Sequence, residues 1–371
     1  MIKTDIQRPL AEEVYREELY ALEYADKGNR RPEGWRLSPR AVRNFILGTD
    51  KPVKTDCKEV HIKQKYFGNN SMIERAIVTL AGNRGLMLVG EPGTAKTMIS
   101  ELISAAVCGC SSNTVQGTAG TTEDNVKYSW TYAMLLATGP VREAIIPAPV
   151  FIGMEKGIIT RFEEITRCPL EVQDILISIM SDKVMNIPEW GSEGMLFAAK
   201  GFNIIATANT RDKGVNEMSS ALKRRFNFET VEPVKNVSLE KAIIAQQCGE
   251  LLKSCGIDTE IDMTAAEVLA SVFVELRSGI SPEKASIPKL SCVMSTAEAV
   301  SVYYQSALEA EYYGNGKITM KNLTENLLGA VAKENKDDLP KLREYYGGAV
   351  KLRAEKLGGI WQELYDSRSQ I

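Results

Sequence analysis

The chain has 371 residues, more than one ordinary hydrophobic core accommodates, so two or three domains are expected. Hydrophobic residues make up 44% of the sequence and charged residues 25%, which is ordinary for a folded globular protein. The 45 Lys and Arg and the 48 Asp and Glu side chains leave a formal charge of −3, which argues against a surface built for nucleic acid without excluding a local basic pore.

Cysteine, histidine and apolar residues narrow the class of protein further. The seven cysteines are an odd number spread along the chain, which favours free thiols in a reducing cytoplasm. His61 is the only histidine, so a histidine-based metal site and a Ser-His-Asp triad are effectively excluded. No apolar run approaches the roughly 20 residues of a membrane helix, and the first residues lack the apolar core of a signal peptide.

The N-terminal residues 1–56 predict a helical extension. Residues 9–26 carry apolar side chains at helical spacing among acidic ones, and residues 27–34 are rich in Arg, Gly and Pro, which should end that helix. Ser38 followed by Pro39 is typical of a helix start, with Ser38 as the N-cap and Pro39 in the first turn.

From about residue 57, short apolar strands alternate with helices. This alternation predicts a parallel sheet covered by helices on both faces. The expected strands are residues 86–89, 114–116, 157–162 and 202–207, and the expected helices begin at residue 96 and cover residues 170–181. Residues 183–199 interrupt the alternation and predict an inserted β-hairpin.

Beyond about residue 234 only helical patterns remain. The expected helices are residues 238–252, 264–276, 295–310 and 321–333. A last helical stretch, residues 342–369, carries many apolar and aromatic side chains, so we expect it to pack on this helical region or on a neighbouring subunit.

Residues 90–97 form the most informative motif of the chain and read Gly-Glu-Pro-Gly-Thr-Ala-Lys-Thr between an expected strand and an expected helix. This is the layout of a phosphate-binding loop, in which glycines let backbone N–H groups converge on phosphate oxygens. Lys96 would meet the β- and γ-phosphates and Thr97 the Mg²⁺. Ala95 stands where glycine is usual, and a right-handed helical start at Ala95 would tolerate it. The alternative, a chance glycine turn before a core helix, is much less favoured by these flanks.

The expected strand at residues 157–162 ends in two carboxylates, Glu163 and Glu164. In a phosphate-loop enzyme the first carboxylate holds the metal through a water, and the second orients the attacking water. The usual first residue is Asp, and the extra methylene of Glu163 moves the carboxylate outward by about one carbon–carbon bond length. Thr160 and Arg161 are unusual in a strand buried on both faces. The alternative interpretation is a strand that ends at a surface pair of Glu side chains.

Two further motifs follow. Asn209 ends an apolar strand, where its side chain can reach a γ-phosphate or its water. Residues 218–226 predict a short helix with a basic end at Arg224 and Arg225. A guanidinium there could enter a neighbouring subunit's nucleotide site as an arginine finger, although on these residues alone charge compensation at a helix C-terminus is favoured.

Taken in order, these motifs resemble AAA+ ATPases of the MoxR family. The family's phosphate loop commonly has Ala before the lysine, and its second motif typically reads Asp-Glu-Ile-Asn-Arg-Ala-Pro, where this chain has Glu163 and Thr166 in place of Asp and Asn. The expected hairpin matches the family's insertion before the sensor strand, and residues 116–140 match its helix-2 insert. The resemblance covers residues 57–310, and the whole chain resembles a subgroup encoded beside von Willebrand factor A-domain proteins.

The resemblance implies an AAA+ αβα core with a parallel sheet at residues 57–233 and a helical lid with C-terminal helices at residues 234–371. It implies ATP and Mg²⁺ as cofactors, hexameric rings or spirals with nucleotide between subunits, and hydrolysis of ATP to ADP and phosphate. That hydrolysis would drive chaperone-like remodelling or maturation of a partner protein with a von Willebrand factor A domain. Two alternatives stay open: a nucleotide-binding scaffold with little hydrolysis, and a nucleic-acid motor, against which the mild acidity argues weakly.

The resemblance also assigns roles to single residues. Thr97 and Glu163 take the metal, Glu164 is the catalytic base, and Asn209 is the sensor beside the γ-phosphate. Arg225, with Arg224 close behind, is the arginine-finger candidate. The residues expected to contact nucleotide are Phe67 and Gly68 at the adenine, Gly90, Glu91, Pro92, Gly93, Thr94, Ala95, Lys96, Thr97 and Met98 at the phosphates, and Lys289, which stands where the family's lid supplies an arginine.

Overall fold

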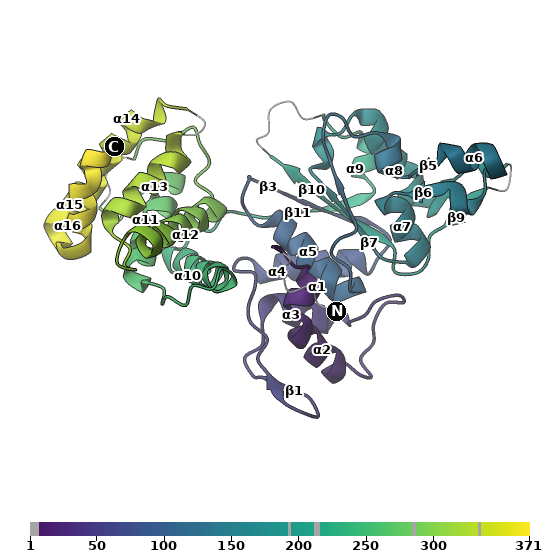
Figure 1. The fold of residues 1–371 in the computed structure, drawn as a ribbon, viewed down its shortest axis with the longest axis horizontal. Coiled ribbons are helices and arrows are strands. Elements are labelled where there is room, and N and C mark those ends of the chain that lie inside the picture. The colour runs from purple at the N-terminus through teal and green to yellow at the C-terminus, as the bar shows by residue number, and fades with distance from the viewer. Residues whose placement is uncertain (1–6, 192–193, 211–215, 284–286, 333–334) are drawn as a thin grey trace. The chain divides into compact units, whose positions relative to one another are not determined.

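The computed structural model describes residues 7–191, 194–210, 216–283, 287–332 and 335–371 (Figure 1). The chain divides into two compact units. The first comprises Met1–Gly90 and Ala95–Val231, and the second comprises Glu91–Thr94 and Glu232–Ile371.

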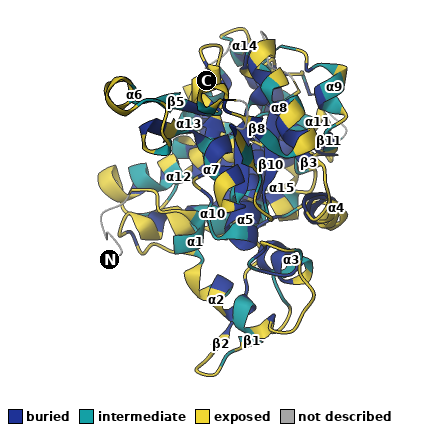
Figure 2. Ribbon diagram, turned by 90° about the vertical axis from the view of Figure 1, so that its right-hand side faces the viewer, coloured by how far each residue is buried: buried dark blue, intermediate teal, exposed yellow. Residues whose placement is uncertain are grey.

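The first unit is built on a five-stranded parallel sheet in the order β11-β3-β10-β7-β4. Its strands are β3 (Gly85–Gly90), β4 (Thr114–Gln116), β7 (Ile159–Glu163), β10 (Asn203–Asn209) and β11 (Phe226–Thr230). The central strands are buried (Figure 2). Because β3 pairs Gly90 with Asn209 of β10, and β4 pairs Gln116 with Glu163 of β7, the carboxyl ends of four strands lie at one edge. The predicted parallel sheet is confirmed.

Strand β11 was not expected from the sequence. Residues 218–226 were expected to be helical, but helix α9 (Ser220–Lys223) is a single turn and Phe226 already pairs with Gly85 of β3. The prediction was wrong because Phe226 was counted as the apolar end of the helix. Its run Phe-Asn-Phe-Glu-Thr has the aromatic and β-branched composition of an edge strand.

Helices cover both faces of the sheet, as the alternation of the sequence predicts. Successive strand residues point to opposite faces, so Leu86 and Leu88 of β3 belong to one apolar cluster and Met87 to the other. The first cluster includes helices α4 (Asn70–Leu80) and α5 (Lys96–Cys108). The second includes α7 (Pro149–Lys156) and α8 (Leu170–Asp182).

The N-terminal extension packs onto the first of these clusters. It comprises α1 (Ala11–Val14), α2 (Arg16–Ala25) and α3 (Pro39–Leu47), so the single helix expected over residues 9–26 is interrupted at Tyr15. Ser38 is the N-cap of α3, as predicted, with its Oγ accepting a hydrogen bond from the N–H of Ala41 at 3.3 Å. Two short strands, β1 (Val53–Lys54) and β2 (Glu59–Val60), follow as an antiparallel pair.

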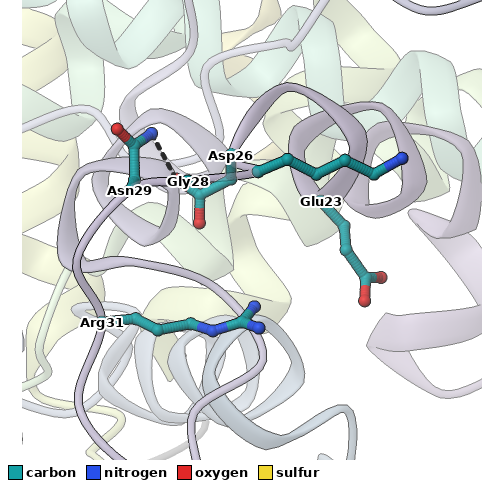
Figure 3. Close-up of a pocket in the computed structure, with 6 residues that line it drawn as sticks. Glu23, Asp26, Gly28, Asn29 and Arg31 are labelled. Carbon is teal, nitrogen blue, oxygen red and sulfur yellow. Dashed lines mark hydrogen bonds between the residues drawn. The ribbon is translucent and has the colours of Figure 1, made fainter.

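The turn between α2 and α3 lines a surface hollow of about 320 Å³ (Figure 3). Asp26 lies at this turn and is buried. Its carboxylate accepts hydrogen bonds from Asn29 Nδ2 at 2.8 Å, from the Ser38 N–H at 2.6 Å and from Ser38 Oγ at 2.5 Å. Asp26 therefore fastens the turn to the start of α3.

Two insertions extend from the sheet. The first contains β5 (Tyr128–Trp130), α6 (Tyr132–Thr138) and β6 (Ile145–Pro147), with β5 and β6 antiparallel. The second is the predicted hairpin of β8 (Val184–Asn186) and β9 (Met195–Phe197), of which residues 192–193 lie outside the described residues. Glu189 of the second insertion joins it to the first, accepting hydrogen bonds from Tyr128 Oη at 2.9 Å and Trp130 Nε1 at 3.2 Å.

The second unit is helical, as expected. Its first helices are α10 (Val237–Ser254), α11 (Met263–Ser278), α12 (Thr296–Tyr313) and α13 (Met320–Ala332), each overlapping a predicted range; residue 333 lies outside the described residues. The last predicted stretch is broken into α14 (Asp338–Tyr345), a π-helical segment Tyr346–Val350, α15 (Lys351–Leu357) and α16 (Gly359–Asp366). The break follows from Gly358 and Gly359, whose φ angles are 59° and 55°.

The C-terminal helices pack on their own unit. Tyr345 and Tyr346 are 1% exposed, and Arg353 of α15 pairs with Glu275 of α11 at 2.7 Å. Tyr345 Oη donates to the same Glu275 carboxylate at 2.9 Å. None of the helices in the described part of the chain combines the length and the apolar content that crossing a bilayer requires.

Candidate active site at the carboxyl edge of the sheet

The phosphate-binding loop, residues 90–97, connects the end of β3 to the start of α5. Ala95 lies in the left-handed region, with φ 70° and ψ 20°, so the expectation of a right-handed start at Ala95 was wrong. The chain has to reverse there before Ile99 donates the first helical hydrogen bond to the Ala95 carbonyl at 3.0 Å. A Cβ in this conformation costs about 1 kcal/mol or more, which explains why glycine is usual at the position.

Lys96 and Thr97 occupy the first turn of α5. Lys96 is only 7% exposed, and its Nζ donates to the Gly90 carbonyl at 3.1 Å, so the ammonium lies in the concave side of the loop. The loop is braced by Thr94, whose Oγ1 donates to the Glu91 carbonyl at 2.9 Å. Thr97 is exposed, and its Oγ1 donates to Glu163 Oε2 at 3.1 Å.

Glu163, at the end of β7, is buried and held through both carboxylate oxygens. Thr207 Oγ1 donates to Oε2 at 2.7 Å, beside the contact from Thr97. Ser100 Oγ and Arg161 Nη2 each donate to Oε1 at 2.7 Å. The sequence pointed to Arg161 only as an anomaly and missed Ser100 and Thr207. Ser100, a polar residue one turn after Lys96 on an apolar helix, is the signal that could have found the first.

Glu164 follows in a strained backbone conformation. Its φ of 55° and ψ of 44° are left-handed, and its N–H donates to Thr207 Oγ1 at 3.0 Å. The side chain is 31% exposed and pairs with Arg167 Nε at 2.8 Å. Gly117 passes so close that a Cβ on it would lie 2.4 Å from the Glu164 carbonyl oxygen. Strain of this kind is maintained by its surroundings and is concentrated at functional sites.

Asn209 completes the group of residues that the structure brings together. It is the last residue of β10, lies beside Gly90 in the sheet, and is partly buried. The neighbouring Thr210 N–H donates to the Gly90 carbonyl at 3.1 Å, which fixes Asn209 next to the loop. The ends of β3, β7 and β10 thus place the loop, the two glutamates and the asparagine side by side.

Arg224 and Arg225 lie at the opposite end of the sheet. The Arg225 carbonyl accepts the N–H of Gly85 at 2.9 Å, and Gly85 begins the strand whose last residue is Gly90. At about 3.3 Å per residue, the strand separates the two ends by about 17 Å. Arg225 is tied down by hydrogen bonds to Ser181 Oγ at 2.9 Å and to the Ala221 carbonyl at 3.1 Å. Arg224 is exposed, and its guanidinium makes no hydrogen bond or ion pair with the described residues.

Four further residues expected at the nucleotide are Phe67, Gly68, Met98 and Lys289. Phe67 and Gly68 precede Asn69, the N-cap of α4, and a Cβ on Gly68 would lie 2.4 Å from Tyr66 Oη. Lys289 belongs to the second unit, where it is exposed in the segment between α11 and α12. Met98 follows Thr97 in α5 and is partly buried.

The donors around Thr97 and Glu163 fit a metal that arrives with a phosphate. A hydroxyl and one carboxylate oxygen, 3.1 Å apart, are hard oxygen ligands of the kind Mg²⁺ prefers. Across the described ranges, no group of three or more His, Cys, Asp or Glu side chains is placed to hold a metal ion. The protein donors alone are therefore few, and phosphate oxygens and waters have to complete the shell.

Comparison with known proteins agrees with this architecture. The family model for the AAA domain of the dynein-related subfamily matches residues 85–226, and that for the YehL-like AAA+ ATPase C-terminal domain matches residues 238–371. The protein YehL of Escherichia coli (strain K12) is 44% identical over 367 residues, which cover 99% of this chain and 98% of YehL. The protein SH1500 of Staphylococcus haemolyticus is 29% identical over 192 residues, 50% of this chain and 70% of SH1500.

Solved structures with a similar fold include two proteins of low sequence identity. The Holliday junction branch migration motor RuvB of Thermotoga maritima is 17% identical, with a TM-score of 0.44 over 82% of this chain and 87% of RuvB. NtrX of Brucella abortus, in complex with ADP, is 12% identical, with a TM-score of 0.47 over 82% of this chain and 69% of NtrX. The family matches and the full-length similarity to YehL decide the assignment: the chain belongs to the YehL-like AAA+ ATPases.

Proposed function

We propose that the protein binds ATP with Mg²⁺ at the carboxyl edge of the sheet and hydrolyses it to ADP and phosphate. The observation that carries this proposal is the 3.1 Å contact of Thr97 Oγ1 with Glu163 Oε2, which joins the phosphate-binding loop to the acidic end of β7. A hydroxyl at the start of the helix, facing a carboxylate, is suited to a Mg²⁺ beside nucleotide phosphates.

The neighbouring side chains have complementary roles in the proposed reaction. Lys96 neutralises the β- and γ-phosphate oxygens, and Mg²⁺, when bound, adds to that neutralisation. Asn209 orients the attacking water, and Glu164 accepts its proton. Since Glu164 is paired with Arg167 in this structure, its carboxylate has to turn away from Arg167 to act. Phe67 and Gly68 are proposed to contact adenine, and Lys289 the γ-phosphate.

We propose further that the second half of the site comes from a neighbouring subunit of a hexameric ring or spiral. The arginines at the start of β11 lie too far from their own loop to act on its nucleotide. Of the two, Arg224 is the better candidate, because it is exposed whereas the Arg225 guanidinium is engaged with Ser181 and Ala221. The resemblance to the MoxR family supports such an assembly.

The proposed use of the hydrolysis is remodelling of a partner protein, for which the resemblance suggests a von Willebrand factor A domain. The two insertions are suited to contact a protein, since Leu136 of α6 is 90% exposed and Phe197 of β9 is 67% exposed. Glu189 joins the insertions, so a movement of one is passed to the other. The partner is testable by capture on ATP-loaded Glu164→Gln protein.

The central experiment measures ATP binding and turnover separately. Lys96→Ala should abolish nucleotide binding. Unchanged ATP affinity in this variant would contradict the assignment of the nucleotide site to the phosphate-binding loop. Glu164→Gln should keep binding and lower turnover by about 100-fold or more, because it removes the base. Glu123→Gln, which changes an exposed acid paired with Lys127, is the matched control and should turn over like the wild type.

A second candidate function is a nucleotide-binding scaffold that hydrolyses slowly. Two observations favour it: both Glu163 oxygens are already engaged, and Glu164 is paired with Arg167. If the wild type and Glu164→Gln bind ATP tightly and hydrolyse it at the same low rate, the protein is a nucleotide-binding scaffold and the proposal of a remodelling ATPase is wrong.

A further inference from the structure

Arg161 and Glu163 project from the same face of β7. Side chains two residues apart in a strand share a face, and here that face is turned to α5, as the place of Ile159 in the α5-side cluster shows. Arg161 is only 4% exposed. A buried arginine in a parallel strand carries a large desolvation cost unless its charge and its donors are all matched.

Each nitrogen of the Arg161 guanidinium has a hydrogen-bond partner. Nη2 donates to Glu163 Oε1 at 2.7 Å, Nε to Ser100 Oγ at 2.9 Å, and Nη1 to the Ser111 carbonyl at 2.7 Å. Glu101 lies 3.5 Å away as a second carboxylate. Ser100 Oγ lies 2.7 Å from Glu163 Oε1 and 2.8 Å from the Thr97 carbonyl. Arg161 and Ser100 therefore both contact Oε1 and, among the described residues, no donor from the loop does.

The two oxygens of Glu163 are thereby given different surroundings. Oε1 faces Arg161 and Ser100 in the interior, and Oε2 faces Thr207 and the hydroxyl of Thr97, an exposed residue. A glutamate has one more rotatable bond than an aspartate, so its carboxylate would be free to swing unless something fixed it. The hydrogen bond from Arg161 Nη2 to Oε1 is the contact that fixes the Glu163 carboxylate.

We propose that Arg161 is a positioning residue for the metal carboxylate: it holds Glu163 so that Oε2 alone is presented to the metal position beside Thr97. The proposal rests on the proposed binding of Mg²⁺ with nucleotide, and it does not need hydrolysis. Groups that orient a metal ligand typically change metal affinity 10- to 100-fold when they are replaced.

Arg161→Lys tests this proposal, because it keeps the charge and removes the fork that reaches Glu163, Ser100 and Ser111 at once. The measurement is the affinity for ADP by calorimetry, first with EDTA and then across a Mg²⁺ titration. We expect ADP affinity in EDTA to stay at the wild-type value, and the Mg²⁺ concentration for half-maximal enhancement to rise about tenfold.

Arg353→Lys is the matched control for a purely structural effect. Arg353 is as buried as Arg161 and pairs with Glu275 at 2.7 Å, but it lies in the second unit. It should lower the melting temperature and leave the Mg²⁺ titration unchanged. If Arg161→Lys behaves like Arg353→Lys, with lower stability and wild-type Mg²⁺ dependence, Arg161 only supports the fold and the proposal is wrong.

A second variant covers the case in which Arg161→Lys does not fold. Ser100→Ala removes one donor to Oε1 and leaves the charge pair, so it should raise the Mg²⁺ requirement by a smaller factor; no rise would overturn the proposal. Failure of the proposed function is distinguishable, because wild-type protein that binds Mg²⁺ with ADP but does not turn over ATP contradicts the ATPase and leaves the Arg161 result intact.

Discussion

The hydroxyl of Thr207 connects the two acidic residues of the site. It donates to Glu163 Oε2 at 2.7 Å and accepts the N–H of Glu164 at 3.0 Å. One side chain on β10 therefore orients the proposed metal carboxylate and, at the same time, fixes the strained backbone of the proposed base. A change at Thr207 should affect the metal carboxylate and the base together.

Thr207→Val replaces this hydroxyl by a methyl group of the same shape. It leaves the Glu164 N–H without its partner, so we expect the free energy of unfolding to fall by about 1–3 kcal/mol. Turnover should fall about tenfold or more while ATP affinity changes little, because the loop is untouched. Urea unfolding and steady-state ATPase assays measure the two effects. Thr207→Ser keeps the hydroxyl and should retain most activity; equal turnover in the Val and Ser variants would contradict the role of the hydroxyl.

Ala95→Gly should be tolerated and mildly stabilising. Ala95 is held at a φ of 70°, which a residue without a Cβ adopts at no steric cost. The relief of about 1–2 kcal/mol is partly offset by the greater freedom of glycine in the unfolded chain. We expect a net gain of up to about 1 kcal/mol in urea unfolding. Ala105→Gly, in the right-handed interior of the same helix, is the control and should destabilise; a loss of stability in both variants would contradict the strain at Ala95.

The sequence could predict the elements whose signals are local. The glycine loop before Lys96, the cap at Ser38 and the hairpin over residues 183–199 each follow from residues adjacent in the chain, and each appears in the structure. The features that could not be predicted depend on residues distant in the sequence. The backbone of Ala95 is set by the loop's approach to α5, and β11 forms because β3 offers it an edge.

Arg161 lies between these two cases. The sequence shows Arg161 only as an unusual residue in a buried strand, although the period of two along a strand places it on the same face as Glu163. Ser100 and Ser111 satisfy the other nitrogens of Arg161. These contacts depend on how α5 and the segment after it lie against β7, which the sequence alone could not predict.

The second unit should show an acid-sensitive step that depends on Asp338. Burial raises the pKa of Asp338, but the bonds from Lys341, Ser291 and Cys292 outweigh burial and lower the pKa to about 2. An unfolded Asp titrates near 3.9, so the stabilisation is complete above about pH 4 and is lost as the pH falls towards 2. That difference corresponds to about 2–3 kcal/mol.

Asp338→Asn removes this titration. We expect the variant to be less stable at pH 7, and the gap between variant and wild type to narrow as the pH falls from 4 to 2. Urea unfolding followed by circular dichroism across that range measures the gap. Asp366→Asn, at an acid exposed in α16, is the control; a gap for Asp338→Asn that does not change with pH would contradict the linkage.

Arg224→Ala should lower ATP turnover by about 1,000-fold or more and leave ATP binding intact, as expected of a guanidinium that acts on the next subunit's nucleotide. Arg225→Ala should have the smaller effect, since its guanidinium is engaged with Ser181 and Ala221. The sharper test mixes two inactive proteins. Lys96→Ala subunits cannot bind nucleotide but carry an intact Arg224, so mixing them with Arg224→Ala subunits should restore part of the turnover. If turnover does not recover at concentrations where both proteins assemble, Arg224 does not act on the nucleotide of a neighbouring subunit.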